Sequence, residues 1–310
     1  MSTNTSNSNS KSGHMAVYQK VTMQILDNMM KGELPWRKTY VAKKGQKAPF
    51  TNYVTGKPYS FINSLLLGEP GEYASFKQIK AAGGNVKKGA KSKMVIYWGE
   101  FIPAEYKEKA EELEKEGKST DHLKVRFPKY YLVFNVKDAE GLKEKKSDGE
   151  TVVMQEAEAP TALARMVIDE YGINQKVRVK SNPAYQPCYL PEEDTVQVPE
   201  KENYFIEEDW YASVFSGLVH STATEERCNR EAEMKKMLDG NMSVKEELIA
   251  EIGSSMILNV CGLDRQETAT QQAAECQKWI AALNNDYRLI VTASNAAEKA
   301  AKMVLGAYAA

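Results

Sequence analysis

The chain has 310 residues, of which 42% are hydrophobic and 27% are charged. This length and this balance describe a globular protein that can bury a sizeable core and has room for two domains. The long apolar stretches, such as residues 61–67, are far shorter than the roughly 20 residues of a membrane helix, and the N-terminus has no apolar signal-peptide core. We therefore expect a cytoplasmic protein with no membrane segment.

The formal net charge of −1 hides an asymmetry between the two ends of the chain. Residues 1–100 contain 15 Lys and Arg against 5 Asp and Glu, a difference of +10, whereas the remainder contains 41 − 15 = 26 basic and 42 − 5 = 37 acidic residues, a difference of −11. The basic half is the candidate for binding a polyanion. The four cysteines are widely scattered without a CxxC pair, so we expect reduced thiols.

The predicted elements begin with a disordered tail over residues 1–15, which are rich in Ser, Asn and Thr. Apolar residues then recur at helical spacing from Val17 to Met29 and Gly32 follows, which predicts an amphipathic helix. Residues 61–67 indicate a buried helix or strand. Residues 73–82 should form a second short helix, closed by two glycines.

A basic turn over residues 85–93 leads into a predicted strand at 94–98, which should pair with residues 130–136. Alternation along that strand should place Tyr97 and Trp98 on opposite faces. The charged run at 105–118 is most simply a solvated helix or loop.

Residues 143–160 are rich in charge, Gly and Ala, and we place a linker there, between domains at 16–142 and 161–310. The second domain should begin with a helix at 161–171, continue through short strands at 177–179 and 195–198, and end in three or more helices from residue 207. The predicted fold class is α+β in both domains. The first should hold a small twisted sheet with helices, and the second a mixed sheet packed against helices.

Several short motifs stand in the order found in a known family. They are LPWR at 34–37, GKPY at 56–59, GGNVKKG at 83–89, YW at 97–98 and VFNV at 133–136. On these motifs the first half resembles the single-stranded-DNA-binding domain of ArdC-type antirestriction proteins, which also occurs in plasmid primases and polyvalent proteins of phages and conjugative elements. The second half resembles the zincin-like metallopeptidase domain that follows it in that family.

The resemblance implies that the first half binds single-stranded DNA, which requires cations for the phosphates and aromatic faces for the bases. The candidate DNA-binding residues are Trp36, Arg37, Lys38, Tyr59, Lys77, Lys87, Lys88, Lys91, Lys93 and Trp98. Each aromatic residue among them has the alternative of a place in the core. The lysines at 87–93 are stronger candidates, because a glycine-flanked turn can bring backbone N–H groups and ammonium groups to one phosphate track.

A working zincin helix carries histidines at i and i+4, which bind the metal, and a glutamate at i+1, which deprotonates the bound water. At these positions the chain has Ser216, His220 and Gly217. The resemblance implies that Glu247 is the third ligand and that Glu251 orients the first histidine.

Only His220 and Glu247 remain where a catalytic zinc usually has three protein ligands. Glycine offers no base, so we predict that this half has no catalytic residue, that no cofactor is required, and that zinc binds at low occupancy if at all. His220 has the alternative of a helix-terminal histidine without a ligand role. A carboxylate at 247 or 251 that was buried without metal would need hydrogen bonds or a raised pKa.

We expect a non-catalytic single-stranded-DNA-binding protein of antirestriction type, belonging to a plasmid, a phage or a conjugative transposon. One alternative is a metallopeptidase whose zinc site is rebuilt from other ligands. The other is an interaction module, in which the acidic residues 161–310 imitate the charge of DNA or dock a host protein such as a restriction enzyme.

Overall fold

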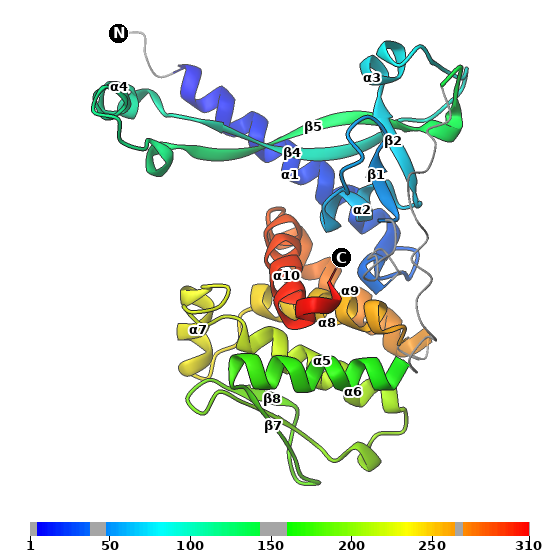
Figure 1. The fold of residues 1–310 in the computed structure, drawn as a ribbon, viewed down its shortest axis with the longest axis vertical. Coiled ribbons are helices and arrows are strands. Elements are labelled where there is room, and N and C mark those ends of the chain that lie inside the picture. Colours follow the sequence, from blue (N-terminus) through cyan, green and yellow to red (C-terminus); the bar gives the residue numbers. More distant parts are fainter. Residues whose placement is uncertain (1–4, 38–47, 143–159, 264–268, 310) are drawn as a thin grey trace.

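The computed structural model describes residues 5–37, 48–142, 160–263 and 269–309. A four-stranded sheet with the order β1-β2-β5-β4 organises the first half. Its strands are β1 (Phe50–Asn52), β2 (Gly71–Ser75), β4 (Lys93–Phe101) and β5 (Val125–Asn135). β1 and β2 are parallel and the other pairs are antiparallel. β4 and β5 run on together beyond the rest of the sheet as a long twisted two-stranded ribbon, the β4–β5 ribbon (Figure 1). The two strands predicted at 94–98 and 130–136 do pair, but residues 94–98 lie opposite 128–132, whereas Phe134 and Asn135 pair with β2.

The helices α1 (Thr5–Met29) and α2 (Phe61–Leu67) both contact this sheet. All seven residues of α2 are buried. The side chain of Asn63 fixes α2 to β4, because its amide donates to the Ile96 carbonyl at 2.9 Å and accepts from the Ile96 N–H at 2.7 Å. The prediction of a disordered tail over residues 1–15 is corrected from Thr5 onward, because α1 begins there. Once the periodic segment at 17–29 has nucleated a helix, each further residue adds one hydrogen bond at little entropic cost.

The helix predicted at 73–82 is wrong in its first three residues. Tyr73 and Ala74 pair with β5 and are fully buried, so sheet pairing overrides the local pattern. The helix α3 (Phe76–Ala81) begins after Ser75, which caps it in a reciprocal arrangement with Gln78.

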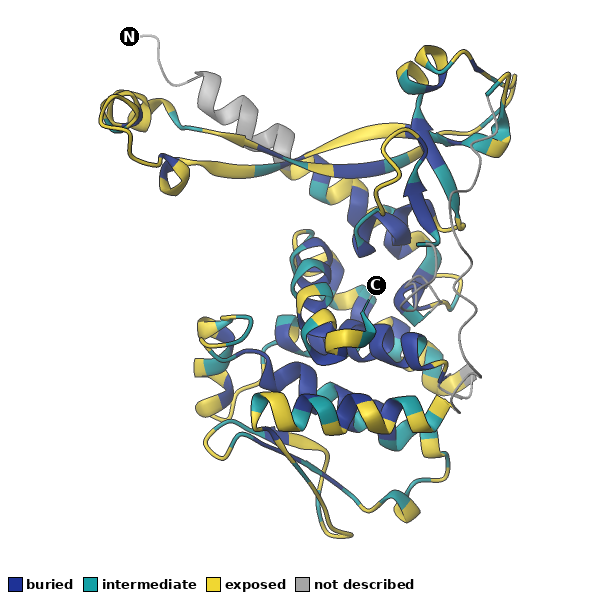
Figure 2. Ribbon diagram, in the orientation of Figure 1, coloured by how far each residue is buried: buried dark blue, intermediate teal, exposed yellow. Residues whose placement is uncertain are grey.

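Smaller elements complete this half. They are η1 (Pro35–Arg37), β3 (Asn85–Val86), η2 (Ala104–Tyr106), α4 (Lys107–Lys115), η3 (Asp121–Leu123), η4 (Val136–Asp138) and β6 (Ala139–Glu140). β3 pairs with β6, and α4 with its flanking 3₁₀ turns forms the exposed tip of the ribbon (Figure 2). The run at 105–118 is thus the solvated helical excursion that its mixed charges predict.

In the second half a mixed three-stranded sheet has the order β7-β9-β8, with β9 in the centre. Its strands are β7 (Arg178–Ser181), β8 (Cys188–Leu190) and β9 (Thr195–Val198). The helical elements are α5 (Pro160–Gln175), η5 (Lys201–Asn203), α6 (Glu207–Ser221), α7 (Glu231–Leu238), α8 (Val244–Cys261), α9 (Ala269–Asn285), α10 (Leu289–Leu305) and η6 (Gly306–Tyr308). The α+β prediction is confirmed for both halves.

Glycines let α6 pack very closely on its neighbours. A Cβ at Gly217 would lie 2.5 Å from Val196 Cγ1 on β9, and a Cβ at Gly253 on α8 would lie 2.9 Å from Val219 Cγ2 on α6. Both contacts are closer than real Cβ atoms allow, so these two positions fix the distance of α6 from the sheet and from α8.

The two halves are joined by direct contacts. Trp36 is fully buried with its ring edge-on to Trp279, the ring centroids 6.4 Å apart. The Thr22 hydroxyl donates to the Tyr287 carbonyl at 2.8 Å, and the Glu298 carboxylate accepts from the Phe61 N–H, the first of α2, at 3.1 Å. Residues 143–159 of the expected linker lie outside the described residues, and the division into domains at 16–142 and 161–310 stays a prediction.

All four cysteines are free thiols, as the sequence predicts. Among the described helices, none is both long enough and apolar enough to cross a membrane.

Candidate functional site

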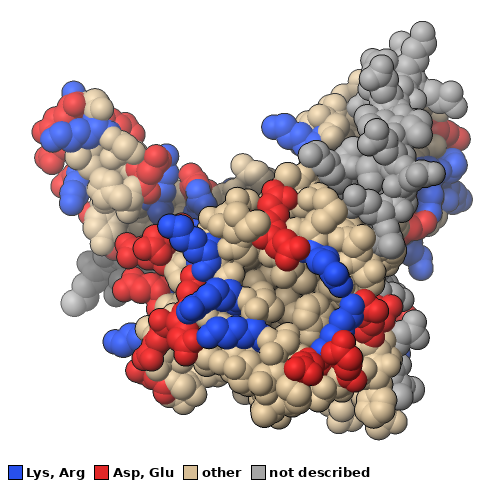
Figure 3. Space-filling model, turned by 60° about the horizontal axis from the view of Figure 1, so that its bottom comes forward, with Lys and Arg blue, Asp and Glu red and all other residues tan. Residues whose placement is uncertain are grey.

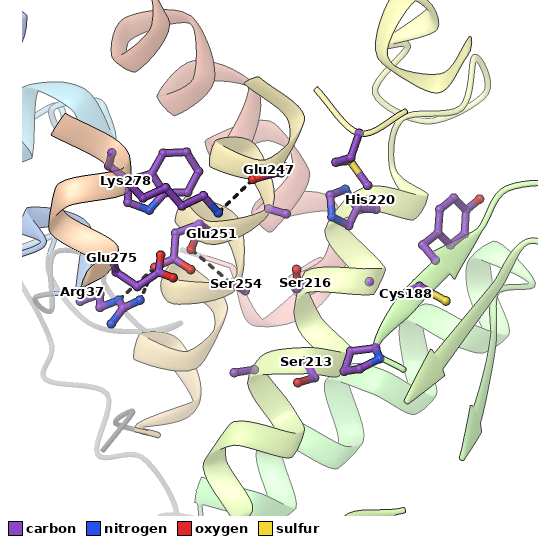
Figure 4. Close-up of a pocket in the computed structure, with 17 residues that line it drawn as sticks. Arg37, Cys188, Ser213, Ser216, His220, Glu247, Glu251, Ser254, Glu275 and Lys278 are labelled. Carbon is purple, nitrogen blue, oxygen red and sulfur yellow. Dashed lines mark hydrogen bonds and ion pairs between the residues drawn. The ribbon is translucent and has the colours of Figure 1, made fainter. Parts of the chain in front are cut away.

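A pocket of about 400 Å³ lies among α6, α8, α9 and β8, and it brings together the residues predicted for the metal site (Figure 4). Ser216, Gly217 and His220 line it from α6, and Glu247 and Glu251 line it from α8. Ser216 and His220 are four residues apart on α6, and Glu247 and Glu251 are four residues apart on α8. This spacing places both members of each pair on the same face of their helix.

His220 is only 8% exposed, and its Nδ1 lies 3.2 Å from Glu246 Oε1. Glu246 is fully buried and also receives two hydrogen bonds from Arg230, at 2.6 and 2.8 Å. Burial raises the pKa of Glu246, but the hydrogen bonds and charges of His220 and Arg230 outweigh burial and lower it. Because an ionised carboxylate can only accept, Nδ1 is the donor, and this leaves Nε2 of His220 for the pocket.

Glu246 is a site residue that the sequence prediction missed. The residue follows Ser243 by three positions, and the Ser243 hydroxyl caps α8 by accepting from the Glu246 N–H at 3.1 Å. That spacing is typical of a helix start, and it could have marked Glu246 as the first inward carboxylate of α8.

Glu251 was predicted to orient the first histidine of the motif, and this is corrected. Its Oε1 accepts instead from Arg37 Nε at 2.9 Å, from Arg37 Nη2 at 2.8 Å and from Trp36 Nε1 at 3.3 Å. With serine at 216 there is no first imidazole for Glu251 to orient. Trp36 and Arg37, predicted as DNA contacts, are therefore corrected as well: Trp36 has no exposed ring face, and the Arg37 side chain is 16% exposed in an ion pair.

Glu247, the predicted third ligand, forms an ion pair with Lys278 of α9, with Nζ and Oε2 2.9 Å apart. This pair is more exposed to solvent than the pair of Arg37 and Glu251, since the side chains of Lys278 and Glu247 are 49% and 36% exposed.

The residues present do not fit a zinc site. Both carboxylates are already neutralised by cations, and only one imidazole faces the pocket. In the described part of the chain, no group of three or more His, Cys, Asp or Glu side chains is arranged to hold a metal ion. At 217, where the catalytic glutamate would stand, even a Cβ would collide with Val196.

The predicted DNA-binding lysines that the structure describes lie at the surface of the first half. Lys77, Lys87, Lys88, Lys91 and Lys93 are all exposed, and Lys87 Nζ donates to the Lys137 carbonyl at 2.8 Å. The last four belong to the basic turn at 87–93, from which β4 begins. Lys38 lies outside the described residues.

Tyr59 and Trp98, the other predicted aromatic contacts, are half-buried and pack against the core. The Tyr59 hydroxyl accepts from Asn52 at 3.3 Å, and burial raises the pKa of that hydroxyl. For Trp36, Tyr59 and Trp98 the structure therefore favours the alternative of a place in the core. The predicted split of neighbours on the strand is confirmed, because Tyr97 is 60% exposed whereas Trp98 packs inward.

Another exposed aromatic residue, Tyr131, lies on the same face of the β4–β5 ribbon as Tyr97, here called the outer face, whereas the exposed Tyr130 lies on the opposite face. Tyr131 is 50% exposed and stands edge-on to Tyr97, with ring centroids 6.1 Å apart. Lys129 is the cross-strand partner of Tyr97, and its Nζ lies 4.9 Å from the ring centroid of Phe127. The sequence analysis did not select these residues, although alternation along residues 125–135 could have found them.

The second half shows no continuous acidic surface on the face drawn in Figure 3. There Lys and Arg side chains alternate with Asp and Glu around a central area of uncharged residues. This face offers no support for the alternative in which the acidic half imitates the charge of DNA.

Comparison with known proteins gives two family matches. Residues 15–134 match the N-terminal domain of anti-restriction factor ArdC, and residues 166–296 match a family described as zincin-like metallopeptidase. The chain is also similar to solved structures of the antirestriction ArdC protein from the R388 plasmid. Against the metal-free structure the identity is 25% and the TM-score 0.62, and against the Mn(II)-bound structure the identity is 25% and the TM-score 0.61. Both comparisons cover 93% of this chain and 96% of the other.

Two curated relatives from Escherichia coli are each named DNA primase TraC. They are 27% and 24% identical over 93% of this chain, which corresponds to 27% and 20% of their own lengths. The chain thus spans about a quarter of the length of these relatives.

Proposed function

Since the chain is an ArdC-type protein, in which the N-terminal domain of the anti-restriction factor precedes a zincin-like metallopeptidase domain, we propose that it binds single-stranded DNA and is not a peptidase. The DNA lies on the outer face of the β4–β5 ribbon. The peptidase-like half provides the scaffold on which the ribbon is mounted.

The observation that carries this proposal is the composition of the outer ribbon face. The antiparallel register puts Tyr97 opposite Lys129, Val95 opposite Tyr131, and Gly99 opposite Phe127. Cross-strand partners point to the same side of a ribbon, so these side chains share one face. The inner face carries Met94 and Trp98, which pack on the core, and also Tyr130 and Leu132, which are exposed. On the outer face Val95 is itself buried in the core, so Tyr97, Lys129 and Tyr131 form the accessible part of that face.

Such a face suits unpaired bases. Tyr97 and Tyr131 stand edge-on to one another at the surface, and a base stacked on an aromatic ring contributes roughly 1–3 kcal/mol whatever its identity. Gly99 supports the arrangement, because a Cβ there would lie 2.9 Å from Phe127 Cζ, and its absence lets the Phe127 ring cover the strand.

Phosphates would meet the basic turn at the start of β4. Lys88 and Lys91 are exposed, and within the described part of the chain neither forms an ion pair or a hydrogen bond. Their ammonium groups are therefore available to phosphate oxygens, and binding should weaken as salt is added.

The absence of peptidase activity rests on the chemistry of the pocket. Ser216 offers a short neutral hydroxyl in place of an imidazole, and Gly217 supplies no base. The chain is similar to an antirestriction protein from the R388 plasmid. We therefore propose that the bound DNA is the single strand of a mobile element, and that binding helps this DNA to survive restriction in a new host.

The test is a fluorescence anisotropy titration of a labelled single-stranded oligonucleotide with the full chain at two salt concentrations. The Tyr97→Ala/Tyr131→Ala variant removes both stacking rings and should weaken binding by about 30-fold or more, at roughly 1 kcal/mol or more for each lost stack. The matched control is Phe205→Ala, which removes an exposed aromatic side chain from the other half. Binding that is insensitive to salt, and equal in all three proteins, would refute the proposal.

A further inference from the structure

We infer that Arg37 and Lys278 act as the resident cations of the pocket, in the place that a divalent metal ion holds in a working zincin. The two carboxylates of the motif on α8, Glu251 and Glu247, each have one of these cations within 3 Å, at 2.8 and 2.9 Å. The inference goes beyond DNA binding, because it concerns how the peptidase-like half is stabilised.

The pair of Arg37 and Glu251 is the more enclosed of the two. The side chains are 16% and 14% exposed, and Oε1 of Glu251 accepts two hydrogen bonds from the guanidinium and one from Trp36. Arg37 comes from η1 of the first half and Glu251 from α8 of the second (Figure 4). The ion pair of Arg37 with Glu251 therefore also connects the two halves of the chain.

Lys278 reaches the pocket from α9 and is positioned by two contacts. Its Nζ lies 2.9 Å from Glu247 Oε2 and 4.6 Å from the ring centroid of Trp279. Trp279 is itself buried against Trp36, whose indole N–H donates to the same Glu251 carboxylate that binds Arg37.

This arrangement gives each of the two motif carboxylates, Glu251 and Glu247, a positive partner without a metal. A partly buried carboxylate needs a compensating positive charge, and each of the two already has one from the chain itself. A divalent ion would have to displace Lys278 from Glu247 and would then find a single imidazole, that of His220. The absence of a histidine at 216 and the presence of a cation at 278 thus act in the same direction, against metal binding.

The first test uses the unaltered full chain in thermal unfolding. A structural metal that binds only the folded state raises Tm, and its removal lowers Tm. We expect EDTA, Zn(II) and Mn(II) each to leave Tm unchanged within about 1 °C. A fall of Tm in EDTA that is restored by either metal would overturn the inference.

The second test asks whether Lys278 excludes the metal. The Ser216→His/Lys278→Met variant supplies a second imidazole and releases Glu247, and isothermal titration should give zinc binding at least about tenfold tighter than in the control. The control is Ser216→His/Lys299→Met, which keeps the added imidazole and removes an exposed lysine of α10 instead. Equal zinc affinity in the two variants would show that Lys278 does not hold the place of the metal. The first test decides the matter if a variant does not fold.

Discussion

The pocket and the β4–β5 ribbon use the same kinds of side chain in opposite ways. In the pocket Trp36 is fully buried, and Arg37 is paired with a carboxylate from the other half of the chain. On the ribbon Tyr97 and Tyr131 are 60% and 50% exposed. One set of aromatic and basic residues holds the molecule together, while the other faces solvent.

The difference shows that an aromatic residue next to a basic one does not by itself indicate a nucleic-acid contact. Whether such residues are available depends on burial, and Trp36 and Arg37 both bind a carboxylate at residue 251, more than 200 positions away in the sequence. If the contrast is correct, changes in the pocket should alter stability and leave DNA binding unchanged. Changes on the ribbon and its basic turn should do the reverse.

The largest effect should come from Glu246→Gln. The change leaves the Arg230 guanidinium, 7% exposed, without its carboxylate, and breaking a buried pair in this way costs roughly 3–5 kcal/mol. Urea unfolding should show a loss of that size, while affinity for single-stranded DNA in the folded variant stays at the level of the unaltered chain. The control is Glu247→Gln, whose half-exposed pair with Lys278 contributes about 1 kcal/mol or less.

The same variant should change the pH dependence of stability. A carboxyl whose folded-state pKa is lowered stabilises the fold fully above its ordinary pKa of 4.5, and this contribution is lost as the pH falls through the lowered value. The stability difference between the unaltered chain and Glu246→Gln should therefore be constant near neutral pH and shrink below about pH 4.5. A difference that grew on acidification would contradict the assignment of Glu246 as an ionised group.

A smaller effect is expected from Gly217→Ala. The added Cβ would lie 2.5 Å from Val196 Cγ1, and overpacking of a well-packed contact costs roughly 1–3 kcal/mol. Val196→Ala removes the opposing methyl groups, so the double variant should be more stable than the sum of the two single losses predicts. Strict additivity in urea unfolding would mean that the cost of a Cβ at position 217 does not arise from its contact with Val196.

The sequence predicts local features well and distant partners poorly. The pairing of β4 with β5 and the split of Tyr97 from Trp98 follow from alternation, which is written in adjacent residues. The pocket residues Ser216, His220 and Glu247 follow from helical spacing within a recognised motif. Such patterns need no knowledge of the rest of the fold.

The roles of Trp36, Arg37 and Glu251 could not be obtained in that way. Their hydrogen bonds exist only because η1 packs on α8 across the two halves, and no local pattern fixes that contact. The strand at Tyr73 and Ala74 was missed for the same reason, since its partner β5 lies some 60 residues further along the chain.

The smallest effect tests the basic turn against the rest of the ribbon. Replacing Lys87, Lys88 and Lys91 with Gln removes three candidate phosphate contacts, so the slope of log K against log salt should become shallower by about 2, at roughly 0.7 for each contact on a single strand. Affinity at low salt should fall about tenfold, and the unfolding free energy should stay within roughly 0.5 kcal/mol because the side chains are exposed.

The matched control removes three exposed lysines from α4, as Lys107→Gln/Lys109→Gln/Lys115→Gln, and so produces the same change of net charge at the far tip of the ribbon. If only the overall charge of the ribbon attracted DNA, the two triple variants would lose the same slope. A shallower slope for the basic-turn variant alone would locate the phosphates at the start of β4, beside the rings of Tyr97 and Tyr131. Bases and backbone would then be bound by neighbouring parts of a single surface, one that the pocket does not share.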